Sequence, residues 1–305
     1  MRLLQPRIWY GAEWRGRVAS CRLQVCKRRH VKVAIQGELG SFSNEAALGF
    51  FPQGVEIVAC PLSAEVFERL ERAEVDAAVV PIENSLAGPV AEHYDLLLTH
   101  NAAIERESML RIRHNLISVP NATLAGLRKV MSHPIALAQC RRFLQGQPHI
   151  QVQPFYDTAG SVKHVMELGD ATLAGIASSQ AAVEYGGKIV CANIEDNAEN
   201  FTRFHVVRRV ADKGSVWQVD AAANKISIAF AIENQPGTLV KALERLAAAG
   251  ADLTKIESRP VPGKPWEYVF YVDVRYTEPE AADKALAALQ GHCSRVKELG
   301  RYRAA

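Results

Sequence analysis

From residue 31 onward, short apolar runs alternate with segments in which apolar residues recur every three or four positions. The short runs predict strands, and the periodic segments predict amphipathic helices. In the first part of the chain the predicted strands are 31–36, 55–60 and 76–80, and the predicted helices are 43–51 and 64–73. Ser63 stands where it can cap the second helix. This alternation predicts a mostly parallel, doubly wound sheet.

A second block of the same kind begins near residue 110. Its predicted strands are 111–119, 129–132, 151–156, 172–177 and 188–191, and its predicted helices are 135–144 and 159–168. The alternating segment 201–208 predicts a further strand that closes the unit. Two α/β lobes around a cleft, as in periplasmic binding proteins, are therefore expected over 31–210, and such a cleft is a frequent place for small ligands.

The pattern changes after a polar stretch at 211–224, which we interpret as a linker. Strands are predicted at 225–232, 253–259, 268–274 and 294–299, and helices at 236–249 and 279–290. The order βαββαβ over 225–302 is typical of a ferredoxin-like domain. The first helix is expected to end at Gly250, since glycine readily adopts the left-handed conformation that follows a helix.

The charge of the chain is concentrated at its start. The net charge is +3, but residues 1–30 hold eight basic residues and one acid, which leaves 28 basic and 32 acidic residues elsewhere. A nucleic-acid partner is therefore not expected. We interpret 1–30 as an unstructured arm or as the product of an upstream start codon. Its Arg-rich, acid-poor composition also loosely matches a plastid transit peptide, whereas a secretory signal is not expected.

Other features restrict the class of protein further. There is no run of 18 apolar residues, so no membrane helix is predicted. The six cysteines form no C-x-x-C pair, and the nine histidines show no metal-ligand spacing. We therefore expect a cytoplasmic protein with reduced thiols, no metal and no cofactor.

Five polar segments stand at the ends of predicted strands or inside the closing strand, where open α/β sheets bind ligands. They are G-E-L-G-S-F-S at 37–43, P-I-E-N-S at 81–85, S-H-P at 132–134 with Gln139 downstream, D-T-A at 157–159 and N-F-T-R-F at 200–204. Each segment alone is also explained by a tight turn, a helix cap or an amphipathic strand. In the closing strand, Thr202 and Phe204 share one face and Arg203 the other.

In this order the five segments resemble those of prephenate dehydratases. The motif E-N-Q-P-G-T-L at 233–239 and the motif E-S-R-P at 257–260 resemble the phenylalanine-binding segments of that family's C-terminal ACT domain. The resemblance covers about 31–302, and Thr238 departs from the alanine usual in the family. It implies the conversion of prephenate to phenylpyruvate with loss of water and carbon dioxide, in L-phenylalanine biosynthesis and without a cofactor.

The resemblance also implies roles for individual residues. The catalytic hydroxyl would be that of Thr202, and Glu83 is the other candidate acid, provided that burial raises its pKa. These two segments are expected to share one pocket. The implied substrate-binding residues are Ser41, Asn84, Ser85, Ser132, Gln139, Thr158, Arg203 and Phe204.

The C-terminal motifs imply allosteric regulation by L-phenylalanine in a homodimer or homotetramer. The implied effector-binding residues are Asn234, Gly237, Thr238, Leu239, Glu257 and Ser258. Glu257 would meet the effector ammonium or hold Arg259 in place.

Three alternatives stay open at this point. Arogenate dehydratase is the nearest, since arogenate has an amino group where prephenate has a ketone. A solute-binding protein would have the same two lobes, and a phenylalanine-responsive regulator without catalysis would have the same C-terminal domain.

Overall fold

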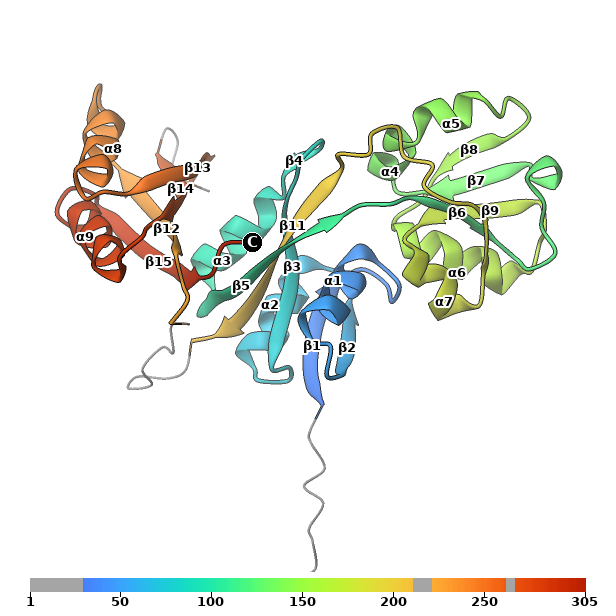
Figure 1. Cartoon of the computed structure of the whole chain (residues 1–305), viewed down its shortest axis with the longest axis horizontal. Helices are drawn as coiled ribbons and strands as arrows, with labels where there is room; N and C mark the ends of the chain where they lie inside the picture. The colour runs from blue at the N-terminus through green and yellow to red at the C-terminus, as the bar shows by residue number, and fades with distance from the viewer. Residues whose placement is uncertain (1–29, 211–220, 262–266) are drawn as a thin grey trace, which may run out of the picture.

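The computed structural model describes residues 30–210, 221–261 and 267–305. Three sheets organise these residues, two in the lobes of the N-terminal part and one in the C-terminal unit (Figure 1). The leader at 1–29 and most of the predicted linker at 211–224 lie outside the described residues.

The first lobe is built on the sheet β2-β1-β3-β11-β5, with β4 paired to β3. β1 pairs in parallel with β2 and β3, while β11 is antiparallel to both β3 and β5. Its elements are β1 (Val31–Gln36), α1 (Phe42–Phe50), β2 (Val55–Cys60), α2 (Ser63–Glu71), β3 (Ala77–Asn84), β4 (Gly88–Pro89), α3 (Ala91–Thr99), β5 (Ala102–Arg111) and β11 (Phe201–Arg209).

The second lobe has the sheet β10-β6-β9-β7-β8, which is also parallel in part and antiparallel in part. The chain enters this lobe after β5 and returns from it into β11 (Figure 1). Its elements are β6 (Asn115–Ser118), the 3-10 helix η1 (Leu124–Gly126), β7 (Lys129–Ser132), α4 (Pro134–Gln139), α5 (Arg141–Gln145), β8 (Gln151–Pro154), α6 (Thr158–Leu168), β9 (Leu173–Ala177), α7 (Ser179–Tyr185) and β10 (Lys188–Cys191).

The C-terminal unit has the βαββαβ order expected from the sequence, with the sheet β13-β14-β12-β15. Gly250, which follows the first helix, has a φ of 77° as expected. The elements are β12 (Lys225–Ile232), α8 (Thr238–Ala248), β13 (Asp252–Pro260), β14 (Tyr268–Arg275), α9 (Pro279–Gln290) and β15 (Arg295–Tyr302).

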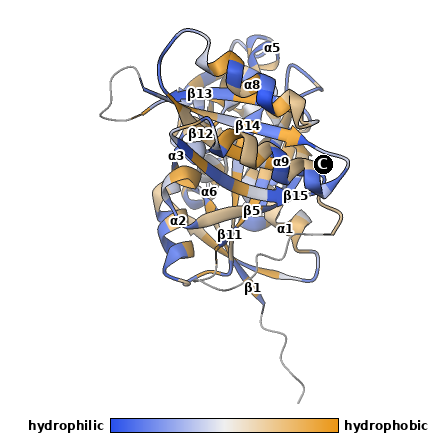
Figure 2. Ribbon diagram, turned by 90° about the vertical axis from the view of Figure 1, so that its left-hand side faces the viewer, coloured by the Kyte–Doolittle hydropathy of each residue, from blue (hydrophilic) through white to orange (hydrophobic). Residues whose placement is uncertain are grey.

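The C-terminal unit packs on the first lobe through an apolar interface. Ile104 of β5 and Val207 of β11 share one buried cluster with Val269, Leu299 and Tyr302 of the C-terminal unit. Figure 2 shows β15 of this unit next to β5. Burial of side chains from both parts favours a fixed arrangement over two independent domains.

The structure differs from the sequence expectations in several elements. The sheets of the lobes are mixed because β11 runs antiparallel to both β3 and β5 in the first lobe, and β6 runs antiparallel to both β9 and β10 in the second. The predicted cap Ser63 is wrong: Leu62 occupies the N-cap position of α2, and the hydroxyl of Ser63 donates instead to Glu92 at 3.0 Å. The apolar pattern did not predict α3, β5 or α7, and it predicted a single helix where the structure has α4 and α5 on either side of Cys140.

Over 30–210, 221–261 and 267–305, no helix combines the length and the apolar character needed to cross a membrane. Over the same ranges, no three His, Cys, Asp or Glu side chains are grouped so that they could hold a metal ion.

The lobes touch at the glycine-rich loop after β1. The hydroxyl of Ser178 donates to the carbonyl of Gly40 at 2.7 Å, and that of Tyr185 donates to the carbonyl of Leu39 at 2.9 Å. Gly40 has a φ of 79°, and a Cβ there would lie 2.6 Å from the Cα of Ala181 in α7. Glycine is therefore required here both by the backbone conformation and by the close approach of the second lobe.

We expect Gly40→Ala to destabilise the protein and to displace α7. The left-handed conformation alone costs an alanine about 1–2 kcal/mol, and the steric overlap with Ala181 adds to that cost. Gly169→Ala is the matched control, because Gly169 has a φ of 66° with no atom within 4 Å of the added Cβ. Urea unfolding measures both variants. Equal losses of stability would contradict the importance of the contact between the lobes.

Candidate functional site

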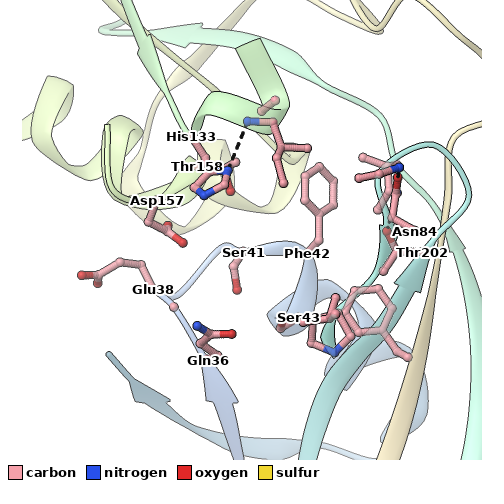
Figure 3. Close-up of a pocket in the computed structure, with 18 of the residues that line it drawn as sticks. Gln36, Glu38, Ser41, Phe42, Ser43, Asn84, His133, Asp157, Thr158 and Thr202 are labelled. Carbon is pink, nitrogen blue, oxygen red and sulfur yellow. Dashed lines mark hydrogen bonds between the residues drawn. The ribbon is translucent and has the colours of Figure 1, made fainter. Parts of the chain in front are cut away.

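A cavity of about 610 Å³ lies between the two lobes (Figure 3). Its walls come from the loop after β1, the ends of β2 and β3, the start of α4 and α6, and β11. Figure 3 shows Ser41, Asn84, His133, Thr158 and Thr202 around the same space. The volume falls within the range of cavities that bind small molecules, about 300–1,000 Å³.

Thr202 and Asn84 form the centre of the polar wall. The strands β11 and β3 are neighbours with Thr202 opposite Asn84, and the Nδ2 of Asn84 donates to the Oγ1 of Thr202 at 2.9 Å. The Oδ1 of Asn84 accepts from the backbone N–H groups of Leu86 and Ala87, which fixes the orientation of the amide. The Thr202 hydroxyl is therefore an acceptor toward Asn84, and its own proton has no protein acceptor within the described residues.

A second layer of side chains holds this pair. Asn84 also donates to the Oδ1 of Asn200 at 2.7 Å, and Asn200 donates to the Oε1 of Gln139 at 2.9 Å. The Nε2 of His114 lies 2.8 Å from the same oxygen of Gln139. Because that oxygen only accepts, the Nε2 of His114 carries a proton, and burial lowers the pKa of this imidazole and favours its neutral form.

Neither His114 nor Asn200 was predicted from the sequence as a site residue. Asn200 stands in the segment N-F-T-R-F, so the motif around it could have identified it. No motif identified His114, because the segment 111–119 was predicted as one strand. The structure breaks that segment between β5 and β6, and the break turns His114 to the cavity.

Two helices direct their N-terminal ends at the cavity. Ser41 caps α1, and the residues Asp157 and Thr158 cap and begin α6. Exposed N–H groups and the helix dipole make such ends favourable for anions. No lysine or arginine lies among the described residues that line the cavity. Carboxylates of a ligand would therefore be held by N–H and hydroxyl groups.

Two acids, Glu38 and Asp157, line the cavity where the loop after β1 meets the second lobe. Glu38 accepts a hydrogen bond from the hydroxyl of Tyr156 at 2.9 Å and forms an ion pair with Lys163 at 3.1 Å. Both partners belong to the second lobe. Burial raises the pKa of Asp157 above its ordinary value. The contacts of Glu38 join the two lobes beside the cavity.

The structure brings six of the predicted site residues together in this cavity. They are Ser41, Asn84, Gln139, Thr158, Phe204 and Thr202. Ser85 and Ser132 do not line it. The hydroxyl of Ser85 bonds to the backbone of Glu199 and Phe201, and the buried hydroxyl of Ser132 donates to the carbonyl of Ile176 at 2.6 Å. Both serines stabilise the backbone around the cavity, which corrects their predicted contact with substrate.

Glu83 and Arg203 also point away from the cavity, so their predicted roles in it are wrong for this structure. Strand alternation places them on the opposite face from Asn84 and Thr202. Glu83 lies 3.0 Å from the Nζ of Lys255, and Arg203 lies 2.6 Å from Asp273, both in the C-terminal unit. A weak signal was present in the sequence, because Arg203 alternates with Thr202 and Phe204.

A second, smaller cavity of about 210 Å³ lies at the start of α8. Four of the predicted effector-binding residues line it: Asn234, Gly237, Thr238 and Leu239. The hydroxyl of Thr238 lies 2.8 Å from the carbonyls of Glu233 and Gln235, so it closes the turn before the helix. Glu257 and Ser258 do not line this cavity in the single chain, since they belong to β13 at the edge of the sheet.

Comparison with known proteins identifies close relatives over most of the chain. The family model "Prephenate dehydratase" matches residues 33–212. An Arabidopsis thaliana protein named arogenate dehydratase/prephenate dehydratase 2, chloroplastic, is 39% identical over 89% of this chain and 72% of its own length.

Two solved structures resemble the chain as a whole. A prephenate dehydratase from Arthrobacter aurescens in complex with L-Phe has a TM-score of 0.80 and 30% identity, covering 90% of both chains. A protein described as GqqA, a novel type of quorum quenching acylase, has a TM-score of 0.82 and 31% identity, covering 90% of this chain and 98% of its own.

Proposed function

Because this chain belongs to the prephenate dehydratase family, a family of lyases, we propose that it converts prephenate to phenylpyruvate in the cavity between its lobes. The observation that carries the proposal is that the Thr202 hydroxyl lines the cavity and accepts from Asn84, which leaves its proton without an acceptor among the described residues. Among the described residues of β11, Thr202 is the one that brings a hydroxyl group to the cavity wall.

The reaction removes the ring hydroxyl and the ring carboxylate together. The C–O bond breaks as the hydroxyl leaves, the C–C bond to the carboxylate supplies electrons to the ring, and carbon dioxide departs. One proton is taken up so that the hydroxyl leaves as water. Aromatisation of the ring drives this step, and the protein has to favour the departing hydroxyl in the transition state.

Thr202 is the better of the two candidate donors. Its hydroxyl lines the cavity, whereas Glu83 is directed to Lys255 on the other side of the sheet. A threonine is too weak an acid to give up its proton completely. We therefore propose a neutral hydrogen bond from Thr202 to the leaving oxygen, which gains strength as negative charge develops there.

The rest of the cavity orients the substrate. The N–H groups and hydroxyls at the start of α1 and α6 suit its carboxylates, and Phe42 and Phe204 offer apolar surface to its ring. The neutral His114 orients Gln139 and through it Asn84. Enclosure between two lobes reduces the water around these groups and strengthens their hydrogen bonds.

We further propose that 31–210 is the catalytic domain, 211–224 the linker and 225–302 an ACT domain that senses L-phenylalanine. Support comes from the cavity at the start of α8 and from the L-Phe complex of the relative from Arthrobacter aurescens. A homodimer or homotetramer would bring Glu257 and Ser258 of one copy near such a cavity in another. The proposed location is the cytoplasm, with the plastid as the alternative if 1–30 is a transit peptide.

Arogenate is the second candidate substrate. The acids Glu38 and Asp157 in the cavity lining would tolerate its ammonium group, and no lysine or arginine is among the described lining residues. The Arabidopsis thaliana relative is named for both activities.

The test is to incubate the purified full chain separately with prephenate and with arogenate, and to measure phenylpyruvate and phenylalanine. We expect formation of phenylpyruvate from prephenate. A higher kcat/KM for arogenate would reverse the assignment of the preferred substrate. No product from either compound would refute the proposed function. Titration of the same protein with L-phenylalanine tests the regulatory part separately, since failure to bind would leave the catalytic part intact.

A further inference from the structure

Two ion pairs connect the C-terminal unit to the cavity wall from behind. Arg203 follows Thr202 in β11, and its Nη1 lies 2.6 Å from the Oδ2 of Asp273 in β14. Glu83 precedes Asn84 in β3, and its Oε1 lies 3.0 Å from the Nζ of Lys255 in β13. The C-terminal unit thus binds the sequence neighbour of each partner in the Thr202–Asn84 hydrogen bond.

These pairs belong to a largely buried cluster of charges. The side chains of Arg203, Asp273 and Lys255 are 9%, 5% and 11% exposed, and Glu107 and Lys225 beside them are 2% and 5% exposed, whereas Glu83 is 37% exposed. Arg203 lies 3.6 Å from Glu107 and 3.5 Å from Glu83, so the two pairs also touch each other. With three cations and three acids, the cluster is balanced when every member is in place.

Such a cluster is poor at stabilising a fold. Removal of two charges from water costs about as much free energy as their attraction returns, and an apolar contact of the same size is often more stable. What the cluster does provide is a fixed position, because each charge tolerates only a narrow geometry. The neighbouring apolar interface already holds the two parts together.

We infer that Asp273 and Lys255 are positioning residues for the reaction, and that they hold Thr202 and Asn84 in register through Arg203 and Glu83. The inference rests on the proposed function only in that it takes Thr202 and Asn84 as the groups that act on the substrate. It assigns to the C-terminal unit a part in building the catalytic site. It also connects the predicted effector segment to the cavity wall, since Glu257 is two residues from Lys255 on the same strand.

The interface offers a matched control. Arg259 of β13 lies 2.7 Å from Asp95 of α3, so it forms an ion pair across the same interface from the same strand. Neither Asp95 nor its neighbours in α3 line the cavity. Tyr94, the residue before Asp95, lies 3.5 Å from Arg203, but Asp95 itself bonds to Arg259 and Tyr271. Loss of this pair therefore weakens the contact between the two parts without removing a charge from the cluster.

The experiment compares Lys255→Met, Asp273→Asn and the control Asp95→Asn in the full chain. kcat and KM are measured with prephenate, and amide hydrogen exchange is followed in β3 and β11. We expect Lys255→Met and Asp273→Asn to lower kcat on the order of tenfold with little change in KM, since small displacements of reacting groups are costly. Exchange in these strands should accelerate. Asp95→Asn and the conservative variant Lys255→Arg should behave like the parent.

The outcomes separate this inference from the proposed function. The inference is wrong if Lys255→Met keeps the parent's kcat and exchange pattern, or if Asp95→Asn shows the same losses. If Asp273→Asn does not fold, Lys255→Met decides, because Lys255 lies toward the edge of the sheet. If the parent itself makes no phenylpyruvate, the proposed function fails, and hydrogen exchange in β3 and β11 still decides the positioning role.

Discussion

Thr202→Ala is expected to lower kcat for prephenate by a factor on the order of 100 or more, the scale of losing one transition-state donor. The alanine removes the only group on this part of β11 that faces the cavity with a free proton, among the described residues. KM should change little, because the hydrogen bond gains most of its strength in the transition state. Steady-state kinetics of phenylpyruvate formation measure both constants.

Thr202→Ser is the matched control, since it keeps the hydroxyl and removes only a methyl group. We expect it to retain most of the parent's kcat. An alanine variant as active as the parent would show that Thr202 is not the donor. A serine variant as inactive as the alanine variant would point to packing of the methyl group rather than to the hydroxyl.

Asn84→Asp is expected to lower kcat by a similar factor, on the order of 100, although the two side chains have the same shape. The carboxylate keeps the bonds from the N–H groups of Leu86 and Ala87, so the turn after β3 should persist. It loses the donor to Thr202, however, and becomes an acceptor for the Thr202 proton. The hydroxyl would then turn from the substrate to the carboxylate.

The fold of this variant is checked by circular dichroism and urea unfolding, and its activity by the same kinetics. A pH profile adds a specific test, because protonation of the new carboxyl would restore a donor and with it part of the activity at low pH. If Asn84→Asp has the parent's kcat near neutral pH, the direction of the hydrogen bond between these two residues is unimportant for the reaction.

Much of the fold was predictable because it depends on local patterns. The strands at 31–36, 55–60 and 225–232 have the bounds expected from their apolar runs. The helix at 279–290 also has its expected bounds. β5 was missed because its sequence, AAIERESMLR, contains four charged residues that a strand prediction disfavours.

The cavity was predictable only in part. Sequence order named Asn84, Gln139, Thr158 and Thr202, and strand alternation placed Thr202 with Phe204. Neither gave the break before β6 that brings His114 to Gln139, because that break depends on how the chain passes between the lobes.

The sequence by itself determined the strands and helices whose apolar pattern is regular, and which polar segments stand at their ends. Local backbone preference and burial of apolar faces act within a few residues, and a sequence displays them directly. Only the tertiary structure decided the roles of Glu83 and Arg203. Glu83 forms an ion pair with Lys255, 172 positions away in the chain, and Arg203 forms one with Asp273, 70 positions away. A contact of that range depends on how whole units pack, and no local pattern records it.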